Sequence, residues 1–157
     1  MRWIAILLLS ATVSVGGINA RASEYAVMGR SIDQVVFLDM TSIQTENGMI
    51  STRTLWVNYP TRELLGVGLV TYYIGDIEFD CKRNLAIQTR VAYYAPISRL
   101  LKVDNAHQNI SVDSRSTAGS ELIKAVCDRS TRTTNKTIDD PWLAASMGIL
   151  MLSTQTQ

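Results

Sequence analysis

Two cysteines carry the most distinctive chemistry in this chain of 157 residues. Cys81 and Cys127 are too far apart in sequence to match the Cys-x-x-Cys spacing that is usual for catalytic redox pairs. They could take part in a metal site, remain as two buried thiols, or form a structural disulfide, which is the usual outcome in an exported protein. A bond between them would close a loop of about 47 residues and contribute roughly 4 kcal/mol by restricting the unfolded chain. We predict the disulfide.

His107 is the only histidine, and it lies in a polar stretch between Asp104 and Asn109. A histidine could act as a general base or as a metal ligand. A base needs a nucleophile and an orienting partner, and the sequence identifies neither. We therefore predict that His107 is a solvated loop residue.

Three acidic residues, Asp76, Glu78 and Asp80, alternate along one expected strand and could bind a hard cation. Their carboxylates would be spaced roughly 7 Å apart, which is too far for tight coordination without further ligands. We predict a solvated, charged sheet face instead. The chain has no G-x-S-x-G motif, phosphate-binding loop or His/Cys metal spacing, so we predict no catalytic residue, metal or cofactor.

The elements that position these residues begin with strands, because hydrophobicity alternates with period two from Tyr25 to Tyr94. Asn47-Gly48 is a strong turn pair, and Pro60, which lacks an N–H, should end a strand and open a loop over 60–68. The alternation is typical of an antiparallel sheet with one buried and one wet face. The predicted strands cover 25–29, 35–40, 52–59, 72–81 and 85–94, the last two forming a hairpin.

Beyond Pro96 the pattern weakens, and we expect a loop over 96–112 with one short strand around 109–112. Helical spacing of apolar residues then predicts a helix over 117–127. Cys81 would end a strand and Cys127 would end this helix, each on its buried face, so both thiols would point into one sheet–helix seam. The fold class is therefore α+β, with an antiparallel sheet of five to six strands, a C-terminal helix packed on one face, and one disulfide.

The C-terminal part should contain a polar linker over 128–139 and a helix over 140–153. Asp140-Pro141 is a typical helix start, with Asp as the N-cap and Pro at the first helical position. The helix is apolar on more than one side but too short to span a membrane. It could cap the sheet, or dock on a partner or a membrane surface.

The first 22 residues have the parts of a secretory signal peptide: Arg2, an apolar run, and small residues around Ala20-Arg21-Ala22. Cleavage after Ala22 or after Ala20 fits, and Ala22 is preferred because alanine then fills both small positions. The run is shorter than the roughly 20 residues that span a bilayer. Removing 1–22 takes away two arginines and moves the formal net charge from +1 to −1, which argues against nucleic-acid binding.

Several short motifs together resemble the surface-adhesin protein E-like domain of Gram-negative bacteria over residues 24–127. They are Phe79-Asp80-Cys81, Tyr93-Tyr94, the strand Val36–Asp39, and the helix from Gly119-Ser120 to Val126-Cys127. The resemblance implies a small α+β domain whose helix is tied to the sheet by a Cys81–Cys127 disulfide. The founding adhesin is an outer-membrane protein that binds host matrix proteins. This chain differs by its linker and final helix, and it lacks a lipid-attachment cysteine.

We therefore expect an exported, non-enzymatic bacterial envelope protein, periplasmic or envelope-associated, that binds a protein or envelope component. An exposed sheet edge is the expected contact. The alternative is a small secreted ligand-binding protein or hydrolase with a pocket between sheet and helix, and an inhibitor of an envelope enzyme is a third option. Peripheral membrane association and homodimer formation are both compatible with the sequence. A pocket that gathers His107 and several carboxylates would favour an enzyme.

Overall fold

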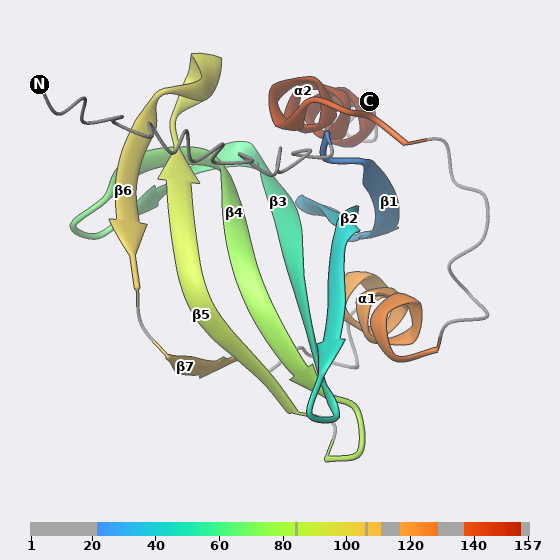
Figure 1. Cartoon of the computed structure of the whole chain (residues 1–157). Helices are drawn as coiled ribbons and strands as arrows, with labels where there is room; N and C mark the ends of the chain where they lie inside the picture. The colour runs from blue at the N-terminus through green and yellow to red at the C-terminus, as the bar shows by residue number, and fades with distance from the viewer. Residues whose placement is uncertain (1–21, 84, 106, 111–116, 129–136, 155–157) are drawn as a thin grey trace, which may run out of the picture.

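A computed structural model describes residues 22–83, 85–105, 107–110, 117–128 and 137–154. Within these residues the chain forms one antiparallel sheet and two α-helices (Figure 1). The strands pair in sequence order from β1 to β6, and β7 pairs with β5 beside β6. The strands are β1 (Tyr25–Arg30), β2 (Gln34–Glu46), β3 (Met49–Leu64), β4 (Gly68–Asp80), β5 (Leu85–Tyr94), β6 (Leu100–Asp104) and β7 (Gln108–Ile110).

The two helices lie against opposite faces of the sheet. Successive strand residues point to opposite faces, so Val36 and Leu38 of β2 face one side and Phe37 faces the other. The first side packs against α1 (Thr117–Cys127), and the second packs against α2 (Pro141–Ser153). The α+β class is confirmed. The expected wet face is instead partly covered by α2.

The α2 helix starts as the sequence predicts. Asp140 is the N-cap and directly precedes Pro141 at the first helical position, and its Oδ1 accepts a hydrogen bond from the backbone N–H of Leu143 at 2.8 Å. Three small residues, Ala144, Ala145 and Gly148, are buried against the sheet. Apolar side chains also remain exposed on the outer side of the helix: Trp142, Leu143, Met147 and Leu150. α2 therefore caps the sheet, which is the first of the two roles expected for this helix.

The Cys81–Cys127 disulfide is confirmed, with an S–S distance of 2.04 Å and a Cα–Cα distance of 5.6 Å. Cys81 directly follows β4, and Cys127 is the last residue of α1. Cys81 packs against the core that includes Leu122 and Val126 of α1. The bond therefore joins the end of a central strand to a helix that otherwise packs on β1 and β2.

The predicted loop over 60–68 is wrong, because β3 runs on to Leu64 and β4 begins at Gly68. The pairing of β3 with β4 is interrupted between Val57 and Arg62. Pro60 lies in this interruption, so the N–H that it lacks is not needed by the ladder. The chain reverses only over the residues between the two strands, where Gly66 has a φ of 74°.

The predicted loop over 96–112 is also wrong in part, because it contains two strands. β7 confirms a short strand at 109–110, while 111 and 112 lie outside the described residues. β6 was not predicted; it ends the strand path, and in the described part of the chain no strand pairs with its outer side. The predicted signal peptide, apart from Ala22, and most of the predicted linker lie outside the described residues, but Ile138 pairs with Tyr25 through two backbone hydrogen bonds.

Candidate functional site

Charged residues form a row across four neighbouring strands on the face that carries α2. Strand register places Asp39 of β2 opposite Arg53 of β3, Arg53 opposite Asp76 of β4, and Asp76 opposite Arg90 of β5. Tyr25 of β1 lies opposite Asp39 and extends the row. Acidic and basic side chains therefore alternate along the row, an arrangement that stabilises adjacent strands.

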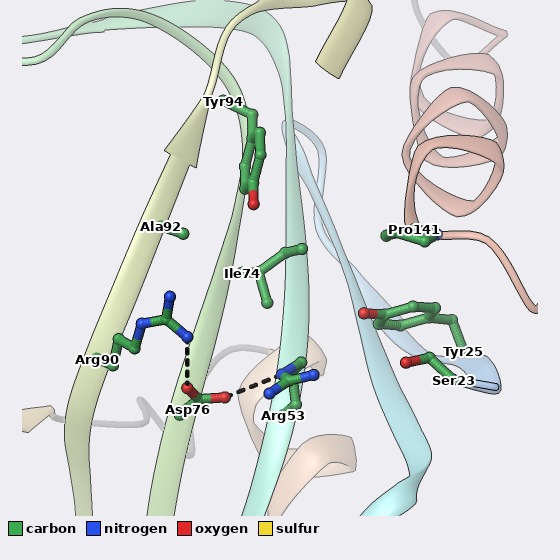
Figure 2. Close-up of a pocket in the computed structure, with 9 residues that line it drawn as sticks. All are labelled: Ser23, Tyr25, Arg53, Ile74, Asp76, Arg90, Ala92, Tyr94 and Pro141. Carbon is green, nitrogen blue, oxygen red and sulfur yellow. Dashed lines mark hydrogen bonds and ion pairs between the residues drawn. The ribbon is translucent and has the colours of Figure 1, made fainter. Parts of the chain in front are cut away.

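Asp76 forms ion pairs with both arginines of the row through its carboxylate (Figure 2). Arg53 donates from Nε to Oδ1 at 3.0 Å, and Arg90 Nη1 lies 3.6 Å from Oδ2. Burial alone would lower the pKa of Arg53, but the hydrogen bond and charge of Asp76 outweigh burial and raise it. The side chains of Arg53, Asp76 and Arg90 together carry about one positive unit, and the carboxylate of Asp39, opposite Arg53, balances this charge within the row.

Asp39 has a different role from Asp76. It is almost fully buried, and its Oδ1 accepts hydrogen bonds from Thr41 Oγ1 at 2.7 Å and from Thr41 N at 3.1 Å. The backbone N–H of Glu24 also approaches the same oxygen, at 3.3 Å. Asp39 therefore fixes the chain just before β1 against β2.

A pocket of about 250 Å³ lies on the row beside the start of α2. Figure 2 shows Arg53, Asp76 and Arg90 at one end of this pocket and Tyr94 at the other. Ile74 and Ala92 come from the central strands between them, and Ser23, Tyr25 and Pro141 line the side next to α2. The pocket is thus apolar in the middle and positively charged at one end.

Two tyrosine hydroxyl groups point into the same space (Figure 2). Burial, followed by the charge of Asp39, raises the pKa of Tyr25 to about 12, and its hydroxyl group, protonated at neutral pH like that of an ordinary tyrosine, can donate. Tyr94 stacks on Tyr72 with ring centroids 4.7 Å apart, and Tyr72 in turn contacts Trp142 of α2. The aromatic stack holds Tyr94 in place and ties it to the helix.

A second depression of about 210 Å³ lies on the far side of the row and shares Arg53 and Asp76 with the first. Its other lining residues are mostly hydroxyl-bearing or acidic, such as Ser42, Thr89 and Glu78. Because it holds more acidic charge than the first, we treat the pocket beside α2 as the candidate site.

The residues that the sequence analysis considered as candidates for chemistry lie outside the pocket beside α2, apart from Asp76. His107 is exposed between β6 and β7 and lines neither pocket. Asp80 accepts hydrogen bonds from Arg83 and from the backbone N–H of Lys82 in the turn after β4, where the bond with the Arg83 side chain lowers its pKa. Among the described residues, no group of three or more His, Cys, Asp or Glu is placed to hold a metal.

The sequence-based prediction missed the two arginines and assigned Asp76 to a solvated face. A regular hairpin with Asp80 opposite Leu85 would place Asp76 opposite Thr89. A bulge between Asp76 and Ile77 shifts the register by one, so Asp76 lies opposite Arg90 instead. The opposite charges of Asp76 and Arg90, which lie on the two strands of the predicted hairpin, were the feature of the sequence that could have indicated this ion pair.

No family model, no curated protein and no solved structure matches this chain. No helix in the described part of the chain is long and apolar enough to cross a membrane. The fold and the site define an α+β protein with a disulfide-linked helix and a pocket beside the start of its last helix that is lined by two arginines and one aspartate.

Proposed function

We propose that this protein is an exported, non-enzymatic binding module of a bacterial envelope, and that its partner is a protein with a carboxylate that enters the pocket beside α2. The carboxylate belongs to an acidic side chain or to the end of the partner chain. The observation that carries the proposal is the convergence of Arg53, Arg90 and two tyrosine hydroxyl groups on one pocket, whose lining residues together carry a net positive charge.

The chemistry of the lining supports an anionic ligand. Arginine presents several N–H donors in a planar fork that matches a carboxylate. Asp76 engages Nε of Arg53 and lies near Nη1 of Arg90, and within the described residues no other acceptor binds these groups. Each guanidinium therefore keeps further N–H donors for a ligand. The apolar middle of the pocket, at Ile74 and Ala92, suits the carbon atoms next to such a carboxylate.

The same lining supports a binding role over the alternative of a hydrolase. A general base needs a lone pair directed at the substrate. The carboxylate that lines this pocket, Asp76, already accepts from one arginine and lies close to a second. His107, the other candidate base, is exposed outside the pocket.

The proposed envelope location draws on other features. The disulfide is consistent with an oxidising compartment, because such bonds are rare in the cytoplasm. The signal-like N-terminus and the resemblance to the adhesin domain agree with export. The open edge at β6, where Leu100 and Val103 are exposed, offers the partner a strand contact near the pocket strand β5.

The test measures binding of short peptides by titration calorimetry. The peptides contain no Asp or Glu, so the terminal group is their only carboxylate: one pool ends in a free carboxylate, and a matched pool of the same peptides ends in an amide. We expect the oxidised protein to bind the carboxylate pool, and R90M to weaken that binding at least about tenfold, since a hydrogen bond to a charged group contributes about 1.5–3 kcal/mol.

The matched control is R83M, because Arg83 pairs with Asp80 outside the pocket. It should bind like the unchanged protein. Equal binding of both pools, or equal loss in R83M and R90M, would contradict a carboxylate site in this pocket.

A further inference from the structure

Ser23 lies both at the predicted cleavage site of the signal peptide and at the wall of the pocket. It is the residue that cleavage after Ala22 would leave at the N-terminus, and it also lines the pocket beside Tyr25 and Arg53 (Figure 2). The predicted cleavage site and the pocket beside α2 therefore share Ser23.

We propose that cleavage of the signal peptide completes the binding site by creating an α-ammonium group on Ser23 at the pocket wall. This inference rests on the proposed function. The step is a hydrolysis by the signal peptidase of the export pathway. Water adds across the Ala22–Ser23 peptide bond, Ala22 leaves with a carboxylate, and the new amine of Ser23 takes up a proton.

Covalent geometry places the new charge at the pocket. The α-nitrogen of Ser23 is about 1.46 Å from its Cα, so it lies within a few ångströms of the side chain that lines the pocket. The chain around Ser23 is held in place, because the N–H of Glu24 donates to buried Asp39 and Tyr25 pairs with Ile138. The ammonium therefore cannot move far from the site.

Electrostatics gives the amine a role in binding. Before cleavage, the nitrogen of Ser23 is a neutral amide; after cleavage, it is a cation with an ordinary pKa near 8. The pocket lining then holds three cations, the ammonium with Arg53 and Arg90, and one carboxylate, Asp76, while the buried carboxylate of Asp39 lies nearby at Glu24. A ligand carboxylate should bind the processed protein more tightly than the unprocessed one.

The experiment compares two forms of the oxidised protein in the same peptide titration. One form begins at Ser23, and the other begins at residue 21 with R21A, so that two alanines precede Ser23 without an added side-chain charge. We expect the longer form to bind the carboxylate pool about two- to fivefold more weakly, because its own ammonium lies two residues farther from the pocket.

A chemical control removes the charge of the amine without adding residues. Selective acetylation of the α-amine of the shorter form at mildly acidic pH, where lysines stay protonated, removes the positive charge and keeps the Ser23 side chain, and we expect the same two- to fivefold loss. N-terminal sequencing of the exported protein should begin at Ser23. A different natural N-terminus, or equal affinity of all forms, would overturn the inference.

The outcomes separate the inference from the proposed function. Equal affinity of all forms together with a loss in R90M overturns only the role of Ser23. No binding of the carboxylate pool, or binding that R90M leaves unchanged, overturns the pocket proposal and the role of Ser23 together.

Discussion

At the scale of single residues, Asp76 both organises the pocket and competes with the ligand. Its carboxylate binds Arg53 and lies beside Arg90, so it occupies donors that a ligand would use. Ion pairs between side chains as exposed as these contribute at most about 1 kcal/mol to stability.

We therefore predict that D76N has a small effect on stability and a positive effect on binding. Removing the charge leaves both arginines without a competing anion, so the carboxylate peptides should bind more tightly, while R53M should bind them more weakly. Peptide titration and urea unfolding measure the two effects. Weaker binding by D76N at unchanged stability would contradict this prediction and would mean that Asp76 aids binding more by positioning the two arginines than it hinders binding by competing with the ligand.

Two tyrosines make stability depend on alkaline pH. Burial is the main cause that raises the pKa of Tyr25 and of Tyr73 to about 12, above the ordinary value of 10.0. The folded state therefore holds these protons more tightly than the unfolded state, and this stabilisation is complete below pH 10.

The free energy of unfolding should fall as the pH rises from about 10 toward 12. Urea unfolding at a series of pH values measures this fall, to which burial of Tyr72 and Tyr93 also contributes by raising their pKa, and Y73F should reduce its slope because one of these groups is removed. A free energy that stays constant across this range would contradict the assigned burial of the two hydroxyl groups.

At the scale of elements, the disulfide should dominate the attachment of α1. The helix packs on β1 and β2, and Cys127 links it to the end of β4. We predict that reduction, or the double variant C81S/C127S, lowers the free energy of unfolding by about 4 kcal/mol, and that both treatments agree. Thermal unfolding with and without reductant measures this, and an unchanged melting curve would contradict it.

The contact between α2 and the sheet depends on Gly148. A Cβ added there would lie 2.9 Å from Val57 Cγ2 and 3.1 Å from Phe37 Cε2, both in the core. We predict that G148A destabilises the protein by about 1 kcal/mol, because overpacking costs about 1–3 kcal/mol and better helix propensity returns up to about 1 kcal/mol.

The control for this prediction is S146A, which improves helix propensity on the same helix and should change stability by a few tenths of a kcal/mol. Urea unfolding compares both variants with the unchanged protein. If G148A were as stable as S146A or more so, α2 would not pack as closely on β2 and β3 as the structure has it.

At the scale of the whole molecule, the parts of the fold that could be predicted are those that local sequence patterns or residue types determine. The hairpin of β4 and β5, the turn at Asn47-Gly48, the cap at Asp140 and the disulfide each depend on alternation, turn chemistry or residue type. β3 beyond Pro60 and all of β6 were missed, since pairing with neighbouring strands decides whether such segments become strands.

The pocket could not be predicted in the same way, because it depends on register among β3, β4 and β5. Arg53 reaches Asp76 through non-local pairing, and Arg90 reaches it only because of the bulge beside Asp76. Tyr25 and Pro141 then meet at the pocket from opposite ends of the chain.

The most direct test of the carboxylate pocket is an NMR titration of the arginine side chains. In the oxidised protein, the Nε resonances of Arg53 and Arg90 should shift together as a peptide with a free C-terminal carboxylate is added, while that of Arg83 stays in place. The amidated peptide should shift none of them. Resonances of Arg53 and Arg90 that do not respond to the carboxylate peptide, or that respond equally to the amide, would contradict the account.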